Sequence, residues 1–122
     1  MIITNENQSN TINYIELPCD ETKTLRDFYS SLLGWKFEEG KDTPDYWFTG
    51  DSGIKGAILK RRNAKQAATI YINVKSIDDC IDGAKRLGAN VLVGKEEISE
   101  GYYALLEDPQ KNVIGVWENK SK

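Results

Sequence analysis

The chain contains one strand-then-helix pattern twice, and this repeat limits its possible folds more than any other feature. The first copy runs from Asn13 to Gly34 and the second, fainter copy from Thr69 to Gly88. Each copy begins with apolar residues at every second position, as in a strand, and continues with the apolar stripe of an amphipathic helix. The final glycines lie 54 positions apart and suit a helix end that needs a left-handed residue. This spacing indicates the duplication of one supersecondary unit.

The alternation divides the strand residues of each copy into two sides. In the first strand, Ile15 and Leu17 point to one side, whereas Tyr14 and Glu16 point to the other. We expect each helix to cover the aliphatic side of its own strands, which would bury the following residues: Ile15, Leu17, Ile70, Ile72 and Val74. The opposite side would then remain open.

Three shorter strand-like segments follow each helix, so each half is predicted as β-α-β-β-β. The first module would cover about residues 12–60 and the second about residues 68–118, with residues 61–67 as the linker. The whole chain, residues 1–122, is long enough for one domain with one sizeable core. The fold class is therefore α+β, with two modules side by side in a curved sheet that has a cleft between them.

Composition excludes several classes of function. The chain has no histidine, which removes the usual general base and the commonest ligand of transition metals. The net charge is −3 with both signs interspersed, which argues against a nucleic-acid surface. The nearest basic cluster, Lys60, Arg61, Arg62 and Lys65, is expected to be a solvated loop.

The same sequence features give expectations about location. No stretch approaches the roughly 18 apolar residues of a membrane helix, and the polar first residues lack the basic and apolar regions of a signal peptide. Cys19 and Cys80 are expected to be free thiols that act as small apolar residues. We therefore expect a cytoplasmic protein with no membrane or nucleic-acid partner.

Three segments together resemble the vicinal oxygen chelate superfamily, which includes glyoxalase I, bleomycin-resistance proteins and extradiol dioxygenases. They read IELPCDETKTLRDFYSSLLGWKF, YINVKSIDDCIDGAKRLGANV and LLEDPQKNVIGVWE, and the resemblance covers roughly residues 12–118. It implies paired βαβββ modules that form a cup-shaped mixed sheet with the helices on the convex face. It also implies a homodimer, since many members dimerise.

The resemblance further implies where a metal would be bound. Metal-dependent members place a His or Glu ligand on the first and last strand of each module, which corresponds here to Tyr14, Gly56, Thr69 and Gly115. Glycine has no ligand side chain, and a threonine hydroxyl is a poor ligand for a transition metal. We therefore expect a member without the metal site and without another cofactor, which counts against glyoxalase I and dioxygenase chemistry.

The open side of the sheet is the predicted site for a small molecule. Aromatic walls with a few polar groups are typical of such pockets, and the candidate lining residues are Tyr14, Trp47, Gly56, Ile58, Thr69, Tyr71, Tyr103, Gly115 and Trp117. We expect an aromatic or partly apolar ligand there. Aromatic residues are also common in strands simply because they pack well, so a filled cleft or a dimer contact is an alternative interpretation.

Glu16 is the one candidate catalytic residue. A carboxylate partly withdrawn from water beside aromatic side chains can act as a general base, so a lyase, isomerase or dioxygenase-like enzyme is the second hypothesis. The alternative for Glu16 is a pair with a lysine such as Lys60, or simple exposure to solvent. A non-catalytic dimeric interaction module is the third hypothesis.

Overall fold

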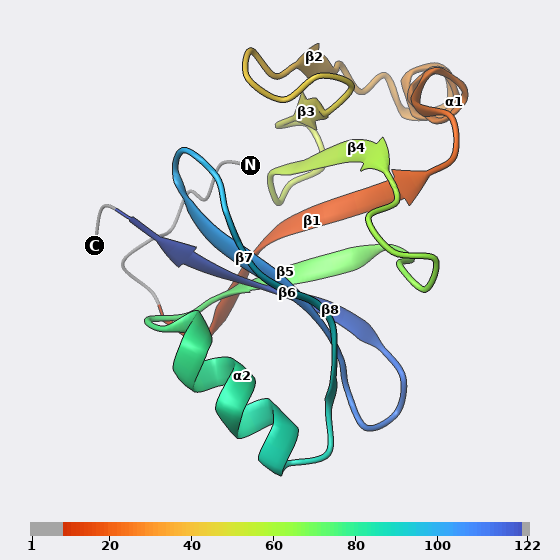
Figure 1. Cartoon of the computed structure of the whole chain (residues 1–122). Coiled ribbons are helices and arrows are strands. Elements are labelled where there is room, and N and C mark those ends of the chain that lie inside the picture. The colour runs from red at the N-terminus through yellow and green to blue at the C-terminus, as the bar shows by residue number, and fades with distance from the viewer. Residues whose placement is uncertain (1–8, 121–122) are drawn as a thin grey trace.

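The computed structural model describes residues 9–120 as two helices and eight strands. Most of the polar first residues lie outside this range. The elements are, in order, β1 (Thr11–Cys19), α1 (Thr22–Leu33), β2 (Glu38–Glu39), β3 (Trp47–Thr49), β4 (Gly56–Lys60), β5 (Thr69–Asn73), α2 (Ile77–Arg86), β6 (Asn90–Glu97), β7 (Gly101–Glu107) and β8 (Val113–Asn119) (Figure 1). The predicted α+β class and the repeated β-α-β-β-β order are confirmed.

All eight strands form one open, strongly curved sheet in the order β2-β3-β4-β1-β5-β8-β7-β6 (Figure 1). Within each half the first strand pairs in parallel with the last, β1 with β4 and β5 with β8. The halves join through the antiparallel pair β1 and β5, so both come from the same chain. This mixed sheet is the cup that the duplicated pattern predicts.

The helix boundaries follow local sequence signals. Gly34 and Gly88 both adopt positive φ, at 74° and 97°, so the predicted left-handed residues after the helices are confirmed. The Ser76 hydroxyl accepts a hydrogen bond from the Asp79 amide at 3.1 Å and caps α2. No side chain caps α1 in this way. None of the helices within residues 9–120 is long and apolar enough to span a membrane.

The two helices lie on outer parts of the sheet rather than over its middle. α2 packs on β6, β7 and β8, where a convex core forms from Ile77, Ala104, Leu106 and Val116. α1 packs on β4, and its Arg26 guanidinium carbon lies 3.6 Å from the ring centroid of Trp47 on β3. The central strands β1 and β5 therefore have no helix directly above them.

This placement reverses the expected burial of the central strands. Ile15, Leu17, Ile70 and Ile72, which we expected beneath the helices, are only half-buried. The side expected to be open holds Tyr14, Glu16, Thr69 and Tyr71, all with 0% exposure. The expectation was wrong because the helices cover the outer strands, while the curvature of the sheet closes the concave side on itself.

Candidate functional site

The concave face of the sheet holds a layer of aromatic side chains at the junction of the two halves. Cross-strand pairing sets Tyr14 opposite Tyr71, and Trp117 opposite Tyr103. The Tyr14 and Tyr71 rings meet edge to face at 6.1 Å between centroids. The structure thus brings the candidate catalytic residue Glu16 together with most of the predicted lining residues: Tyr14, Thr69, Tyr71, Tyr103, Gly115 and Trp117.

Three predicted lining residues lie on the other face. β1 pairs in parallel with β4 so that Ile15 is opposite Gly56, and Trp47 is in turn opposite Ile58. Gly56, Ile58 and Trp47 therefore share the convex face. Placing Ile58 and Trp47 beside Tyr14 was wrong, whereas Gly56 still borders the same pocket as Tyr14. A shift of one residue moves a whole strand to the other face, and the alternation alone does not fix that register. Phe48 and Ala57 take the concave positions, as the pairing of Phe48 with Ala57 requires.

Gly115 creates room for a protein side chain. A Cβ atom at this position would lie 2.4–2.6 Å from three atoms of the Tyr71 ring. The missing side chain therefore allows the Tyr71 ring to lie against β8. The space expected for a ligand at this position is filled by that ring.

Glu16 lies at the centre of a buried hydrogen-bond network, with 0% exposure. Its Oε2 accepts from the Tyr46 hydroxyl at 2.7 Å, and its Oε1 accepts from the Tyr71 hydroxyl at 2.8 Å. Oε1 also accepts from Gln66 Nε2 at 3.2 Å and from Arg62 Nη1, which completes a salt bridge. The expected pairing with a lysine such as Lys60 was wrong, because the partner is Arg62. Four donors leave the carboxylate well satisfied in this conformation.

The connection between the halves supplies two of these donors, Gln66 and Arg62, and Arg62 was expected in a solvated loop. Gln66 is 2% exposed, and its Oε1 accepts from the Arg62 amide at 2.9 Å, so the segment curls back over the sheet. Lys60, Arg61 and Lys65 are exposed, as expected for that basic cluster. Nothing in the sequence distinguishes Arg62 from these neighbours, because its direction depends on the buried carboxylate 46 positions earlier.

The network keeps its two tyrosines and Arg62 protonated. Burial raises the pKa of Tyr46 and of Tyr71 well above the ordinary value, and the nearby Glu16 carboxylate raises it further. Both hydroxyls therefore remain donors. Burial alone would lower the pKa of Arg62, but the Glu16 carboxylate outweighs it and the pKa is raised. The guanidinium is therefore a permanent charge in the concave side of the sheet.

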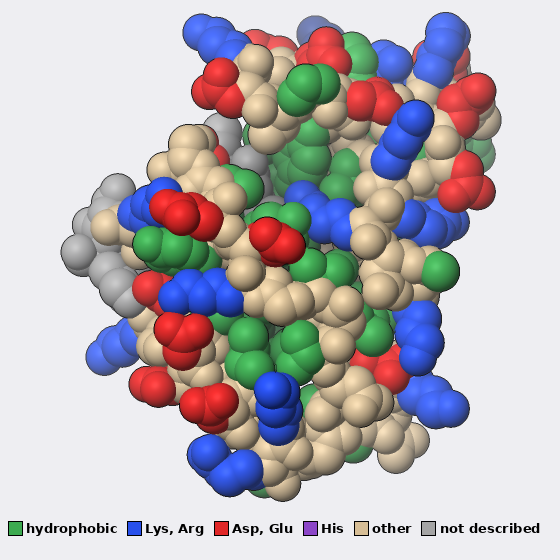
Figure 2. Space-filling view, viewed as in Figure 1, with side chains coloured by type: hydrophobic (Ala, Val, Ile, Leu, Met, Phe, Trp, Pro, Cys, Tyr) green, Lys and Arg blue, Asp and Glu red, His purple; other side chains and the backbone are tan. Residues whose placement is uncertain are grey.

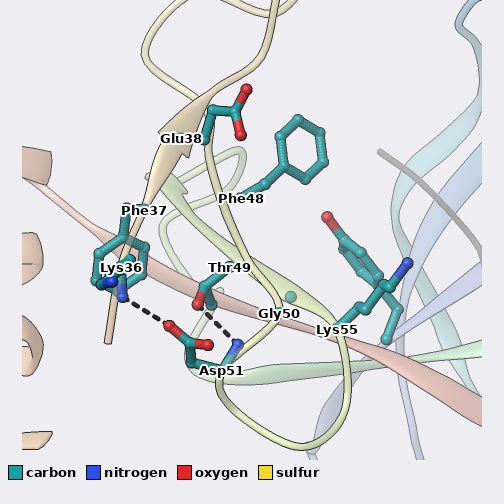
Figure 3. A pocket seen from close by; sticks show the side chains of 10 residues that line it. Lys36, Phe37, Glu38, Phe48, Thr49, Gly50, Asp51 and Lys55 are labelled. Atoms are coloured by element: carbon teal, nitrogen blue, oxygen red, sulfur yellow. Dashed lines mark hydrogen bonds between the residues drawn. The ribbon is translucent and has the colours of Figure 1, made fainter. Parts of the chain in front are cut away.

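A pocket opens beside this network, between the β2–β3 region and the start of β4. Its volume is about 480 Å³, within the range of small-molecule sites. Figure 3 shows Phe37, Phe48 and Lys55 around it, and the full lining is Tyr14, Lys36, Phe37, Glu38, Phe48, Thr49, Gly50, Asp51, Lys55 and Gly56. In Figure 2 hydrophobic side chains are visible in a hollow below β2 and β3, with Lys and Arg side chains beside it.

Tyr14 connects the pocket to the buried carboxylate. It has no exposed surface of its own and borders the pocket from within the core. Its hydroxyl lies 2.9 Å from the Tyr46 hydroxyl, which donates to Glu16. Since the Tyr46 proton is committed to Glu16, Tyr14 is the donor in the first bond. A hydrogen-bond chain therefore leads from the pocket wall to Glu16.

The positions that metal-dependent relatives use do not offer a metal-binding set. With Ala57 in place of Gly56 as the concave residue of β4, the four positions hold a phenol, a methyl group, a threonine hydroxyl and a glycine, at Tyr14, Ala57, Thr69 and Gly115. No group of three or more His, Cys, Asp or Glu side chains within residues 9–120 is arranged to hold a metal. This donor set does not fit a divalent transition metal.

Both cysteine thiols are free within the described structure, and neither lies in the pocket. Burial raises the pKa of Cys19 and of Cys80, which keeps both as thiols rather than thiolates. Their expected role as small apolar residues agrees with this environment. Neither thiol is a candidate nucleophile.

The fold places the chain among proteins built from paired βαβββ modules. Its two halves share one curved sheet, and the concave side of this sheet is lined by aromatic residues. The sequence profile of the Glyoxalase/Bleomycin resistance protein/Dioxygenase superfamily matches residues 11–116. The chain belongs to this superfamily, and the resemblance seen in the sequence is confirmed. No curated protein matches the chain.

Solved structures of similar fold share little sequence with the chain. A hypothetical protein from Bacillus halodurans C-125 is 20% identical with a TM-score of 0.67, and the match covers 94% of this chain and 98% of that one. A superfamily member from Vibrio splendidus 12B01 is 11% identical, with a TM-score of 0.63 and coverage of 89% and 99%. A methylmalonyl-CoA epimerase from Streptomyces coelicolor is 13% identical, with a TM-score of 0.56 and coverage of 93% and 97%. These similarities establish the fold alone.

Proposed function

We propose that the protein binds an aromatic or partly apolar small molecule without a metal ion. The observation that supports this function is the pocket of about 480 Å³ beside the aromatic layer. Phe37 and Phe48 offer apolar surface, while Lys36, Lys55 and Asp51 offer polar groups at its edge. A mostly apolar pocket with a few polar groups is the usual form of a small-molecule site.

The donor set supports binding without a metal. A superfamily member that keeps the cup but lacks His and Glu at the ligand positions retains the shape of the site and loses the Lewis acid. The protein would then sequester its ligand, as bleomycin-resistance proteins do, rather than convert it. We further propose a cytoplasmic location, where small-molecule ligands are accessible.

An enzymatic role is the second candidate, and one observation favours it. The hydrogen-bond chain from Tyr14 through Tyr46 leads from the pocket wall to the Glu16 carboxylate. In a lyase or isomerase, Glu16 could accept a proton through this chain without touching the substrate. Binding ranks first because four donors already occupy Glu16.

The proposed function is tested by thermal melting of the untagged protein with a panel of aromatic compounds. A ligand that binds the folded state raises the melting temperature, by an amount that grows with its concentration. Phe48→Ala should remove the shift, because Phe48 lines the pocket. Leu87→Ala is the matched control, since Leu87 is 81% exposed and lies at the end of α2. No shift with any compound would refute the proposal.

Metal independence needs its own measurement on the same preparation. Elemental analysis should find no bound nickel, zinc, manganese or iron, and adding each metal should leave the melting temperature unchanged. A tag must be absent because it would supply the histidines that the chain lacks. One tightly bound equivalent of metal would show that ligands outside the four positions form a site.

A further inference from the structure

Thr49 brings a hydroxyl group that is largely withdrawn from water to the wall of the pocket. The residue is 7% exposed, yet it lines the cavity of about 480 Å³ together with Phe37 and Phe48 (Figure 3). The charged lining residues, by contrast, are all exposed: Lys36, Glu38, Asp51 and Lys55. A buried polar group in a cavity wall has to find its hydrogen-bond partners in the protein or in what fills the cavity.

The Thr49 hydroxyl uses only part of its hydrogen-bonding capacity. Its oxygen accepts from the Asp51 amide at 3.1 Å. A hydroxyl can also donate one proton, and within residues 9–120 no group accepts the proton of Thr49. A buried donor without an acceptor costs free energy, so this donor indicates a partner inside the cavity. Water can fill that role in the free protein, and an oxygen atom of a ligand can replace it.

The position of this donor is fixed by its surroundings. The pairing of β3 with β4 sets Thr49 opposite Gly56, and the Asp51 amide holds the Thr49 oxygen from the following turn. Asp51 is itself tied to the segment after α1, because its Oδ2 accepts from the Lys36 amide at 2.9 Å. Figure 3 shows both bonds as dashed lines. A donor that is already ordered loses little conformational entropy when it binds a ligand.

Space for a ligand is available next to Thr49. A Cβ atom added to Gly50 would meet no atom within 4 Å, although Gly50 lines the pocket. Phe37 and Phe48 are both half-buried and offer apolar surface to the same cavity. The cavity therefore has room for an aromatic body beside the Thr49 donor.

The charges around the pocket favour no particular net charge of the ligand. Two lysines, Lys36 and Lys55, stand against two carboxylates, Glu38 and Asp51. The feature that distinguishes one aromatic ligand from another is therefore the buried donor. A ligand that lacks an acceptor leaves such a donor unpaired, which is an effective way to reject it.

We propose that Thr49 is a specificity-determining residue, which donates a hydrogen bond to a carbonyl-type oxygen of an aromatic ligand. This inference rests on the proposed function, because it names the chemical class of the bound molecule. The hydroxyl supplies the donor, the two phenylalanine rings supply the apolar contact, and the open space at Gly50 admits the ligand.

The test compares two probes of nearly equal shape, acetophenone and α-methylstyrene, by calorimetric titration of the untagged protein. They differ in one group, since acetophenone has C=O where α-methylstyrene has C=CH2. Thr49→Val keeps the shape of the side chain and removes the donor, so acetophenone should bind about fivefold more weakly. The affinity for α-methylstyrene should stay the same or rise. Comparing each probe with itself in the two proteins cancels the difference in hydration between the probes.

A structural effect of the substitution is separated by the matched control Thr49→Ser. Serine keeps a hydroxyl group, so this variant should retain the wild-type affinity for acetophenone within about twofold. Thr49→Val also loses the bond from the Asp51 amide, and a merely structural role of Thr49 predicts that both probes weaken by the same factor. That result would overturn the inference.

An infrared measurement on the wild-type protein decides the matter if Thr49→Val does not fold. The C=O stretching frequency of bound acetophenone should lie below its value in hexane, because a hydrogen bond to the oxygen weakens the C=O bond. A frequency equal to that in hexane would overturn the inference.

Gly50→Leu tests whether both probes bind in this pocket. Leucine would fill the space beside Thr49, and Gly50 is not among the glycines with positive φ, so its backbone accepts a side chain. Binding of both probes should weaken about tenfold or more. Gly94→Leu is the matched control, since Gly94 also has no atom within 4 Å of an added Cβ but lies outside the pocket. Unchanged binding to Gly50→Leu would overturn the inference.

The remaining outcomes separate this inference from the proposed function. If Thr49→Val weakens neither probe, the inference fails, but the proposed function is supported because a small aromatic molecule is bound. Binding of neither probe to the wild-type protein would overturn the inference, while a thermal shift with another compound of the panel would still support the proposed function. If the whole panel gives no thermal shift, the proposed function fails as well.

Discussion

At the residue scale, the buried pair of Glu16 and Arg62 illustrates how far a sequence pattern leads. Strand alternation places Glu16 on the same face as Tyr14, and the register confirms this. The alternation gives no information about Arg62 or Gln66, because both come from a segment without periodicity. The Arg62 and Gln66 side chains point inward because a buried carboxylate needs partners. This contact joins residues far apart in the sequence, so local patterns do not reveal it.

Removing the cation should be costly. Arg62→Met would leave Glu16 buried without its charge partner, and breaking a buried pair in this way costs about 3–5 kcal/mol of unfolding free energy. Urea unfolding at neutral pH measures the loss. Arg61→Met is the control and should change the free energy of unfolding little, because Arg61 lies 3.7 Å from a highly exposed Asp20.

Stability should also fall in alkaline solution because of the buried tyrosines. The folded-state pKa values of Tyr46 and Tyr71 are raised above the ordinary value by burial and by Glu16. A raised folded pKa means that the folded state holds the proton more tightly, so its contribution is complete below about pH 10 and is lost above that value. The free energy of unfolding should therefore decrease as the pH rises above about 10.

The variants Tyr46→Phe and Tyr71→Phe identify the groups responsible for this loss. Each should flatten the pH dependence, since phenylalanine has no proton to release, although each also loses a hydrogen bond at neutral pH. Tyr102→Phe is the control, because Tyr102 is only half-buried and lies outside the Glu16 network. If the free energy of unfolding falls equally steeply with pH in all three variants, the loss is due to lysines instead.

Gly115 has no room for a side chain, whereas Gly94, another strand glycine, has open space beside it. A Cβ at this position would lie 2.4 Å from the Tyr71 ring, which has no exposed surface and cannot move aside easily. Gly115→Ala should destabilise the protein by about 1–3 kcal/mol through overpacking. Gly94→Ala adds the same methyl group where no atom lies within 4 Å, so urea unfolding should find little loss there.

At the element scale, the type and order of the segments could be predicted, but the register of one strand could not. The helices and the longer strands follow from strong periodicity and from Gly34 and Gly88. β4 has five residues, four of them buried, so no polar alternation marks which side faces inward. Its register is fixed by pairing with Ile15 and Glu16 on β1, and this pairing places Gly56 outward and Ala57 inward.

The cap of α2 is an element-scale feature that depends on one side chain, Ser76. Ser76 accepts from the Asp79 amide, and the first turn also carries Asp78 and Asp79, which favour the positive end of the helix dipole. Ser76→Ala should cost about 1 kcal/mol of unfolding free energy. Ser99→Ala removes an exposed serine outside any helix and should cost less. Equal losses would argue against a capping role.

At the scale of the whole molecule, the sheet is covered unevenly. α2 has a convex core beneath it, whereas α1 exposes 54% of Phe28, 63% of Leu32 and 52% of Leu33. The half-buried aliphatic residues of β1 and β5 leave further apolar surface on the sheet. A sequence predicts the apolar stripe of α1 readily, but it does not reveal whether that stripe packs inside the chain.

We expect this exposed stripe to contribute to a homodimer, as the superfamily resemblance implies. Apolar side chains that remain exposed in one chain gain about 25 cal/mol per Å² when a second copy covers them. Sedimentation or light scattering should give twice the 13.8 kDa chain mass at micromolar concentration. Leu32→Glu should shift the protein toward the monomer, because it would bury an unpaired charge at the interface.

The control for this prediction is an equally exposed apolar residue elsewhere. Leu87, at the end of α2, is 81% exposed, and Leu87→Glu should leave the mass unchanged if α1 forms the contact. A wild-type monomer at all concentrations would contradict the prediction and would leave the α1 stripe exposed in solution. Ligand binding measured on the Leu32→Glu monomer then indicates whether the pocket depends on the second copy. Because the two halves of the sheet pair within one chain, we expect the monomer to retain the affinity of the dimer.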